Sequence, residues 1–201
     1  MESDFLQPPG GAPHVIQITT DGFVEGARII GSRVIETAKD SGMVFNSFSA
    51  GGYTTDLFLQ NHGNAGGQFN AYGPWDAVFV PMSANHIRQS ATEYADSLTT
   101  FINTIRGPNW INDPNALIVL VSDDWSTLIG TGVTQADLDR RNNEFADVQN
   151  QVAESLSRVA FFNMQRFGEE GPLKQGRLLG DGVHLTKSGQ LIKGALFMDS
   201  W

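Results

Sequence analysis

Two side chains near the C-terminus have the types and the spacing needed for proton transfer. Asp181 stands three residues before His184 in the glycine-rich segment GDGVHLTKSGQ. A histidine on a loop can act as a general base near neutral pH, and a carboxylate that holds its ring fixes the tautomer and stabilises the imidazolium. This spacing allows one turn to supply both groups. The alternative is a loop aspartate followed by a histidine that caps the next helix.

The same segment resembles the last motif block of the SGNH/GDSL hydrolases, a D-x-x-H followed by Leu-Thr and a downstream glycine. The first block of that family is a Gly-Asp-Ser that runs on to a further glycine. Its counterpart here is TTDGFVEG, in which Asp21 and Gly26 match the aspartate and the final glycine. The position of the nucleophilic serine is occupied by Gly22, and that of the preceding glycine by Thr20.

Two further blocks of the family have counterparts in the expected order. The segment FSAGGYTTDLF fits a glycine ahead of a threonine-rich helix start, with Gly52 as the backbone donor. The third block, Gly-x-Asn-Asp, reads Ser83-Ala84-Asn85-His86, so that only the asparagine is retained. Four blocks in register cover nearly the whole chain, and on them the chain is identified as a member of the SGNH/GDSL family.

The resemblance implies a role for each matching residue. His184 would be the base and Asp181 its carboxylate. The expected oxyanion donors are Gly52, Asn85 and the amide of residue 22. Each such donor lowers the barrier of acyl transfer by about 3–4 kcal/mol. For Asn85 the alternative is a turn-forming asparagine after a strand, and His86 is either a scaffold substitution or a substrate contact.

Glycine at position 22 has no side chain that could attack an ester. Four explanations stay open: a deliberate substitution that traps substrate, natural loss of the nucleophile, replacement by a neighbouring hydroxyl such as Thr20 or Ser83, or direct activation of water by His184 and Asp181. Because two blocks also deviate at flanking positions, natural divergence is favoured over a single deliberate change. Removing one member of a triad leaves a residual rate of roughly 10³–10⁴ over water.

Apolar runs alternate with amphipathic segments between these blocks. Strands are expected at residues 15–19, 43–48, 76–82, 116–121 and 159–163. Helices are expected at residues 24–41, 54–63 and 186–198, and from Ser90 and Thr134 onward. Ser90 with Glu93 predicts a capping box, and Thr134 with Asp137 resembles another helix start. The apolar stripe of the helix after Ser90 comprises Tyr94, Leu98, Phe101, Ile102 and Ile105.

This order of elements predicts an α/β fold, with a central five-stranded, mainly parallel sheet in a three-layer α/β/α arrangement. The arrangement is flavodoxin-like and of the SGNH-hydrolase type. A single domain is expected over residues 15–201, after a flexible segment at residues 1–14. Such folds bind ligands at the carboxyl ends of their strands, which is where the four motif blocks fall.

Composition restricts the classes of function. The chain has 201 residues, 40% of them apolar, and no cysteine, which excludes disulfides and thiolate chemistry. A net charge of −9 disfavours nucleic acid as a partner. No segment has the length of a membrane span, and the N-terminus lacks the apolar region of a signal peptide, so a soluble protein is expected. No cofactor or metal is expected.

The leading functional hypothesis is an esterase that removes acetyl or other short acyl groups from a carbohydrate. Asp21, His86 and Trp125 are the candidate substrate contacts. Further aromatic and acidic groups in predicted loops could also grip a sugar, namely Trp75, Trp110, Asp123 and Asp124. The second hypothesis is a non-catalytic recognition or structural module within a larger surface or virion assembly. A Rossmann-type cofactor domain is disfavoured, because no G-x-G-x-x-G follows the first strand.

Overall fold

The computed structural model describes residues 32–34, 45–47, 52–62, 73–122, 132–164 and 185–190. The chain divides into two units, Met1–Ser49 and Ala50–Trp201, and each is described by itself. The predicted strand at residues 15–19 lies outside the described residues, as does most of the predicted helix at 24–41.

Two short antiparallel strands are described in the first unit, β1 (Ser32–Val34) and β2 (Phe45–Ser47). The strand expected at residues 43–48 is therefore confirmed over β2. The helix expected at residues 24–41 is wrong over β1, where Val34 pairs with Phe45. Gly31 and Ser32 are weak helix formers, and β-branched Val34 favours extended backbone, so local preference does not support a continuous helix here.

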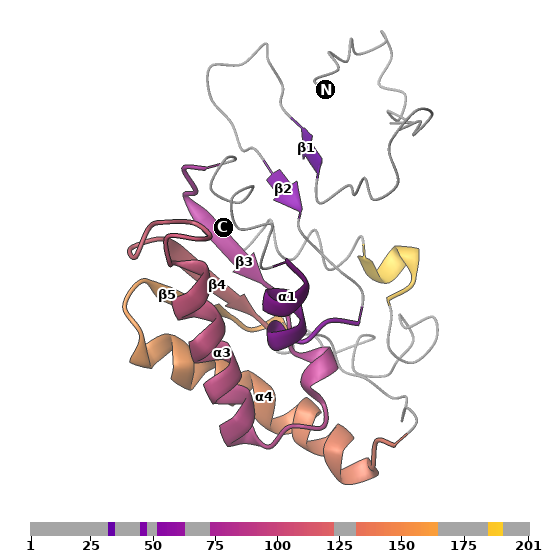
Figure 1. Cartoon of the computed structure of the whole chain (residues 1–201). Coiled ribbons are helices and arrows are strands. Elements are labelled where there is room, and N and C mark those ends of the chain that lie inside the picture. Colours follow the sequence, from indigo (N-terminus) through magenta and orange to yellow (C-terminus); the bar gives the residue numbers. More distant parts are fainter. Residues whose placement is uncertain are drawn as a thin grey trace, which may run out of the picture. The chain divides into compact units, whose positions relative to one another are not determined.

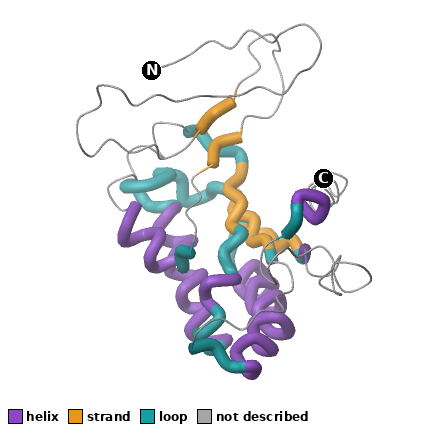
Figure 2. The backbone as a smooth tube through the Cα atoms, turned by 90° about the vertical axis from the view of Figure 1, so that its right-hand side faces the viewer, coloured by secondary structure: helices purple, strands orange, loops and turns teal. Residues whose placement is uncertain are grey.

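A parallel sheet forms the centre of the second unit. It comprises β3 (Ala77–Val80), β4 (Leu117–Val121) and β5 (Val159–Phe162), in that spatial order. Both neighbouring pairs are parallel, with Val78 opposite Ile118 and Ile118 opposite Val159. The α/β class and the parallel sheet are thus present, whereas the predicted total of five strands stays a prediction. Figure 1 shows the three strands side by side, and in Figure 2, turned by 90°, they overlap.

The described helices of this unit include α1 (Thr55–His62), the 3₁₀ turn η2 (Ala84–His86), α3 (Ala91–Ile105) and α4 (Gln135–Ser155). Helices α3 and α4 lie together against one face of the sheet (Figure 1). The predicted apolar stripe of α3 is confirmed, because all five of its members are buried. Within the described ranges no helix is long and apolar enough to cross a bilayer.

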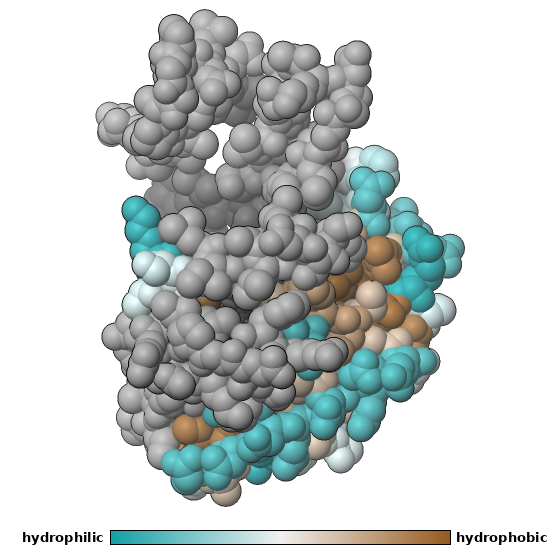
Figure 3. All heavy atoms as spheres, turned by 180° about the vertical axis from the view of Figure 1, so that it is seen from behind, coloured by the Kyte–Doolittle hydropathy of each residue, from teal (hydrophilic) through white to brown (hydrophobic). Residues whose placement is uncertain are grey.

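Both faces of the sheet are apolar. Side chains alternate along a strand, so neighbouring residues of β4 point to opposite faces. Val119 and Val121 pack with Met164 in one cluster, joined by the half-buried Phe79 and Phe162. Figure 3, which views the molecule from the side opposite to Figure 1, shows apolar side chains gathered on that side. A parallel sheet that is apolar on both faces needs cover on both, as a three-layer fold provides.

Capping boxes start both long helices, as the sequence predicts. At α3, the Ser90 N–H donates to Glu93 Oε2 (2.7 Å), and the Glu93 N–H donates to Ser90 Oγ (3.3 Å). At α4, the Thr134 N–H donates to Asp137 Oδ2 (2.9 Å), and the Asp137 N–H donates to Thr134 Oγ1 (3.2 Å). The hydrogen bond from the Thr134 backbone, then that from its hydroxyl, and then Arg140 lower the pKa of Asp137 from 3.8 to about 2.

One buried arginine links elements at the end of the sheet where its parallel strands begin. Arg106, at the end of α3, donates to the carbonyl oxygens of Ala116 (2.8 Å), Ser157 (3.0 Å) and Arg158 (2.8 Å). Ala116 precedes β4, and Ser157 and Arg158 precede β5. The guanidinium therefore ties the C-terminus of α3 to the starts of two adjacent strands.

Asp137→Asn should lower the stability of the chain in a pH-dependent way. Because the pKa of Asp137 is lower in the folded chain than its usual value, the ionised carboxylate stabilises the fold above about pH 4. This stabilisation is lost as the pH falls toward 2. Urea unfolding of the wild type and the variant should therefore differ at pH 6 and converge as the pH falls to about 2. A difference that is constant across this range would contradict the assignment.

Arg106→Met should lower the free energy of unfolding by about 2–4 kcal/mol, because the carbonyl oxygens of Ala116 and Ser157 lose their guanidinium donors, whereas that of Arg158 keeps the Ile118 N–H. Urea unfolding monitored by circular dichroism measures the change. Asn103→Ala, on an exposed position of the same helix, is the matched control and should change stability by less than about 0.5 kcal/mol. Equal effects of the two changes would show that the guanidinium contacts do not stabilise the sheet edge.

Candidate functional site

The segment after β3 brings the third motif block to the carboxyl end of the sheet. Ser83 is buried, Asn85 is exposed and His86 is 1% exposed. Ser83 precedes the turn η2 (Ala84–His86), and its carbonyl oxygen accepts the His86 N–H at 3.1 Å. Because the turn is so tight, consecutive side chains leave it in different directions. Asn85 therefore faces outward while His86 enters the core.

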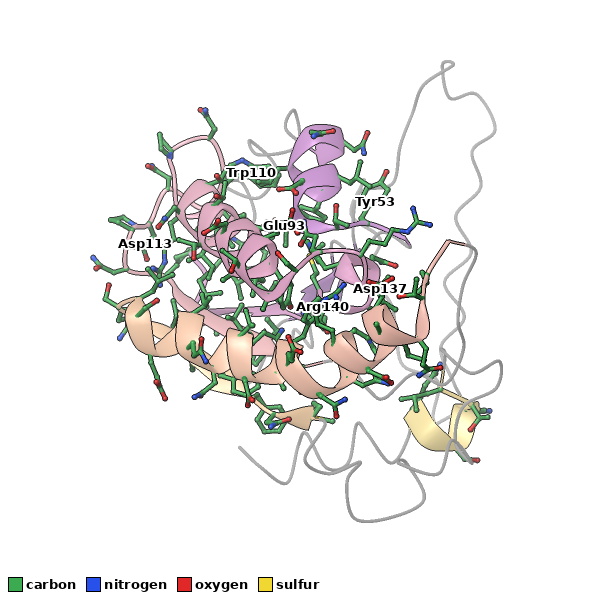
Figure 4. All side chains as sticks on the ribbon, turned by 90° about the horizontal axis from the view of Figure 1, so that it is seen from below. Tyr53, Glu93, Trp110, Asp113, Asp137 and Arg140 are labelled. Carbon is green, nitrogen blue, oxygen red and sulfur yellow. The ribbon has the colours of Figure 1, made fainter. Side chains whose placement is uncertain are left out.

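Asn85 is tied to the second motif block. Its Nδ2 donates to the Tyr53 carbonyl oxygen at 3.0 Å, across 32 positions of sequence. Tyr53 directly follows Gly52 and stands two residues before the start of α1; Figure 4 labels it in the loop leading into that helix. The two blocks that the resemblance assigns to the oxyanion hole therefore meet at this hydrogen bond.

Gly52 has the left-handed backbone conformation, with a φ of +78°. A Cβ at this position would meet no atom within 4 Å, so space does not require a glycine here. The backbone does, because a side chain at this φ costs about 1–2 kcal/mol. This glycine is exposed, as a donor to a bound substrate must be.

A second hydrogen bond to the segment that follows Gly52 is made by His86. Its Nε2 accepts the Thr55 N–H at 3.0 Å, and its Nδ1 lies 2.7 Å from Gln89 Oε1. A backbone N–H can only donate, so Nε2 is the unprotonated nitrogen and the proton of the neutral ring is on Nδ1. Gln89 in turn donates from Nε2 to Ser97 Oγ at 3.1 Å. These contacts favour the scaffold role of His86 over contact with substrate.

A pair of stacked aromatic rings packs against the His86 ring on one side. The Tyr94 ring lies 5.0 Å from it, centroid to centroid, and stacks at 4.3 Å on Phe145 of α4. The Tyr94 hydroxyl donates to the Met82 carbonyl oxygen at 3.2 Å, just after β3. The imidazole is therefore held between the end of a strand and two helices.

The ends of β4 and β5 are linked by polar side chains. Ser122 Oγ donates to Asn163 Oδ1 at 3.2 Å, and each residue directly follows its strand. Gln149 of α4 donates from Nε2 to the Val121 carbonyl oxygen at 3.2 Å. These hydrogen bonds hold the carboxyl ends of β4 and β5 in place, at the end of the sheet where the third motif block lies.

Several predicted site residues lie outside the described part of the chain. They are Asp181, His184, Gly22, Asp21 and Trp125, together with Thr20. The helix expected after His184 is confirmed at its start, since residues 187–190 are helical. Thr186 Oγ1 there accepts the Gly189 N–H at 3.2 Å, and its carbonyl oxygen accepts the Gln190 N–H at 2.9 Å.

Trp110 corrects one expectation from the sequence. It is 4% exposed and stacks on Phe58 of α1 at 5.9 Å, so it belongs to the core and cannot grip a sugar. Trp75 lines a hollow of about 310 Å³ with Ile111 and Asp113. These residues precede β3 and β4 and therefore lie at the amino ends of the strands, whereas Asn85 follows the carboxyl end of β3. Figure 4 shows Asp113 far from Tyr53. The hollow is therefore separate from the candidate site.

Sequence reasoning missed three partners in this site: the Tyr53 carbonyl, the Thr55 N–H and the Gln89 side chain. Only Gln89 has a local signal, because it stands three residues after His86 in a turn-forming segment. The other two are backbone groups, which no residue type reveals. Within the described residues, no cluster of histidine, aspartate and glutamate side chains could hold a metal ion.

The comparison with family models gives one match, to the GDSL-like Lipase/Acylhydrolase family over residues 19–192. The matched range contains all four motif blocks, from Thr20 to Gln190. No curated protein matches the chain. On the extent of the family match, together with the parallel sheet and the two joined blocks, the chain belongs to the GDSL-like lipase/acylhydrolase family.

Proposed function

We propose that this chain is an ester-hydrolase scaffold that binds O-acylated, most notably acetylated, carbohydrate and turns it over slowly because Gly22 stands in the position of the nucleophile. The observation that supports the proposal best is the hydrogen bond from Asn85 to the Tyr53 carbonyl. It joins the segments of the two expected oxyanion donors, Gly52 and Asn85, at the carboxyl end of a parallel sheet.

The Asn85 amide suits an oxyanion hole. One N–H of its Nδ2 is used by the Tyr53 carbonyl, which fixes the orientation of the amide plane. No described residue accepts the second N–H, and the side chain is exposed. A donor held in place before substrate arrives costs no reorganisation during the reaction, and this is the source of its catalytic effect.

The chemistry assigned to the site is the attack of an oxygen nucleophile on an ester carbonyl. In the family pattern, serine would attack, His184 would accept its proton, and Asp181 would hold the imidazole. With Gly22 in the position of the serine, the same imidazole would activate water instead. The remaining donors would still stabilise the tetrahedral intermediate, with a residual rate of roughly 10³–10⁴ over water.

The choice of carbohydrate rests on the residues predicted around the site. Asp21, Asp123, Asp124 and Trp125 stand next to predicted strand ends. Carboxylates accept hydrogen bonds from sugar hydroxyls, and an indole packs against the apolar face of a sugar ring. His86 takes no part in these contacts, because its side chain is buried.

A non-catalytic recognition module is the second candidate, and Gly22 is the observation that favours it. The oxyanion donors bind a carbonyl group whether or not a nucleophile is present. A chain that kept these donors and lost the serine would recognise an acylated sugar without cleaving it.

Gly22→Ser should separate the two candidates. If the rest of the site is competent, turnover of p-nitrophenyl acetate and of an acetylated oligosaccharide should rise by at least about 100-fold. The matched control is Gly22→Ser combined with His184→Ala, which should return turnover to the background. Gly22→Ala should give no gain.

The unsubstituted chain should bind an acetylated oligosaccharide more tightly than its deacetylated form, as measured by calorimetry. Equal affinity for both forms, together with no gain from Gly22→Ser, would contradict both the hydrolase and the recognition proposals.

Asn85→Ala in the Gly22→Ser chain should lower kcat about 10²–10³-fold with a smaller change in KM, because an oxyanion donor acts mainly in the transition state. Asn103→Ala, an exposed asparagine of α3, is the control and should leave kcat unchanged. A loss confined to KM would assign Asn85 to substrate binding instead.

A further inference from the structure

We infer that His86 is a positioning residue for the proposed oxyanion hole: its neutral imidazole accepts the Thr55 N–H and thereby fixes the segment that begins with Gly52. The inference rests on the proposed function, since it assigns a catalytic purpose to that segment. In the third block of the family an aspartate stands at this position, whereas this chain has His86.

The hydrogen bonds around His86 form a series in which the donor and the acceptor of each bond are fixed. The Thr55 N–H donates to Nε2 at 3.0 Å, so the ring proton is on Nδ1, which faces Gln89 Oε1 at 2.7 Å. The amide nitrogen of Gln89 donates to Ser97 Oγ at 3.1 Å, so its oxygen must face the imidazole. Each partner therefore orients the next, and the acceptor offered to Thr55 cannot rotate away.

Two helices anchor this chain of hydrogen bonds. Ser97 belongs to α3, and the Gln89 carbonyl oxygen accepts Arg140 Nε of α4 at 2.9 Å. The imidazole also packs against Tyr94 and is 1% exposed. The position of Nε2 is thus set by contacts with both long helices, α3 and α4.

Thr55 depends on this acceptor. It is the first residue of α1, where a helix leaves backbone N–H groups without partners of its own. Its side chain is fully buried, so water has little access to replace a lost acceptor. The Tyr53 carbonyl, two residues earlier, is held by Asn85. The two ties from consecutive residues of η2 thus fix both ends of the segment that follows Gly52.

Substitution of His86 by glutamine or by asparagine distinguishes the role of Nε2 from that of Nδ1. Glutamine at position 86 places its side-chain oxygen about where Nε2 lies, so His86→Gln keeps an acceptor for Thr55. Asparagine reaches only as far as Nδ1, so His86→Asn keeps the contact with Gln89 and removes the acceptor. Neither variant introduces a charge, and circular dichroism would verify that both fold.

In the Gly22→Ser chain, His86→Asn should lower kcat by at least about 10-fold with little change in KM, because misplaced donors weaken stabilisation of the transition state. His86→Gln should restore kcat to within about threefold of the parent. Hydrogen exchange of the Thr55 amide, followed by NMR, should be at least about 10-fold faster in His86→Asn and protected in His86→Gln.

Each outcome decides the inference. Unchanged protection of Thr55 in His86→Asn would overturn it, as would an equal loss of kcat in both variants. If the Gly22→Ser parent shows no turnover, the hydrolase proposal is contradicted independently of the role of His86. The exchange of the Thr55 and Gly52 amides then decides whether His86 positions the segment.

Discussion

The structure of the candidate site depends on how the start of α1 satisfies its backbone hydrogen bonds. A helix leaves its first N–H groups without internal partners, and those that are buried must find acceptors elsewhere. Here the Thr55 N–H donates to His86, and the Tyr53 carbonyl two residues earlier accepts a hydrogen bond from Asn85. Both acceptor and donor come from η2, so one three-residue turn fixes the loop that contains Gly52. The requirement to satisfy these groups makes the geometry of the second block depend on that of the third.

Much of this arrangement follows from local sequence signals. The caps at Ser90 and Thr134 and the apolar stripe of α3 were predictable, because side-chain spacing along a helix is a local property. The parallel strands were predictable for a similar reason, as their apolar runs alternate with helices. The position of Asn85 at a strand end followed from the same pattern and from the motif.

Other features depended on contacts that no local pattern contains. Trp110 stands in a turn rich in glycine, proline and asparagine, yet it is buried because α1 places Phe58 beside it. The extended residues of β1 depend on pairing with β2 rather than on the helix-like spacing of their apolar neighbours. His86 had two open interpretations, and only the positions of Thr55 and Gln89 distinguish them.

The groups that shape the site are distinct from the groups that would carry out its chemistry. The former comprise backbone groups and buried hydrogen bonds that also stabilise the fold, so the absence of a serine at position 22 need not disturb them. The most direct test is an experimental structure of the Gly22→Ser chain after reaction with a p-nitrophenyl phosphonate, which mimics the tetrahedral intermediate. The account predicts a phosphonyl oxygen about 2.7–3.1 Å from both the Gly52 nitrogen and Asn85 Nδ2, with His184 beside the modified serine. A phosphonyl group that points away from Gly52 and Asn85, or a serine remote from them, would contradict it.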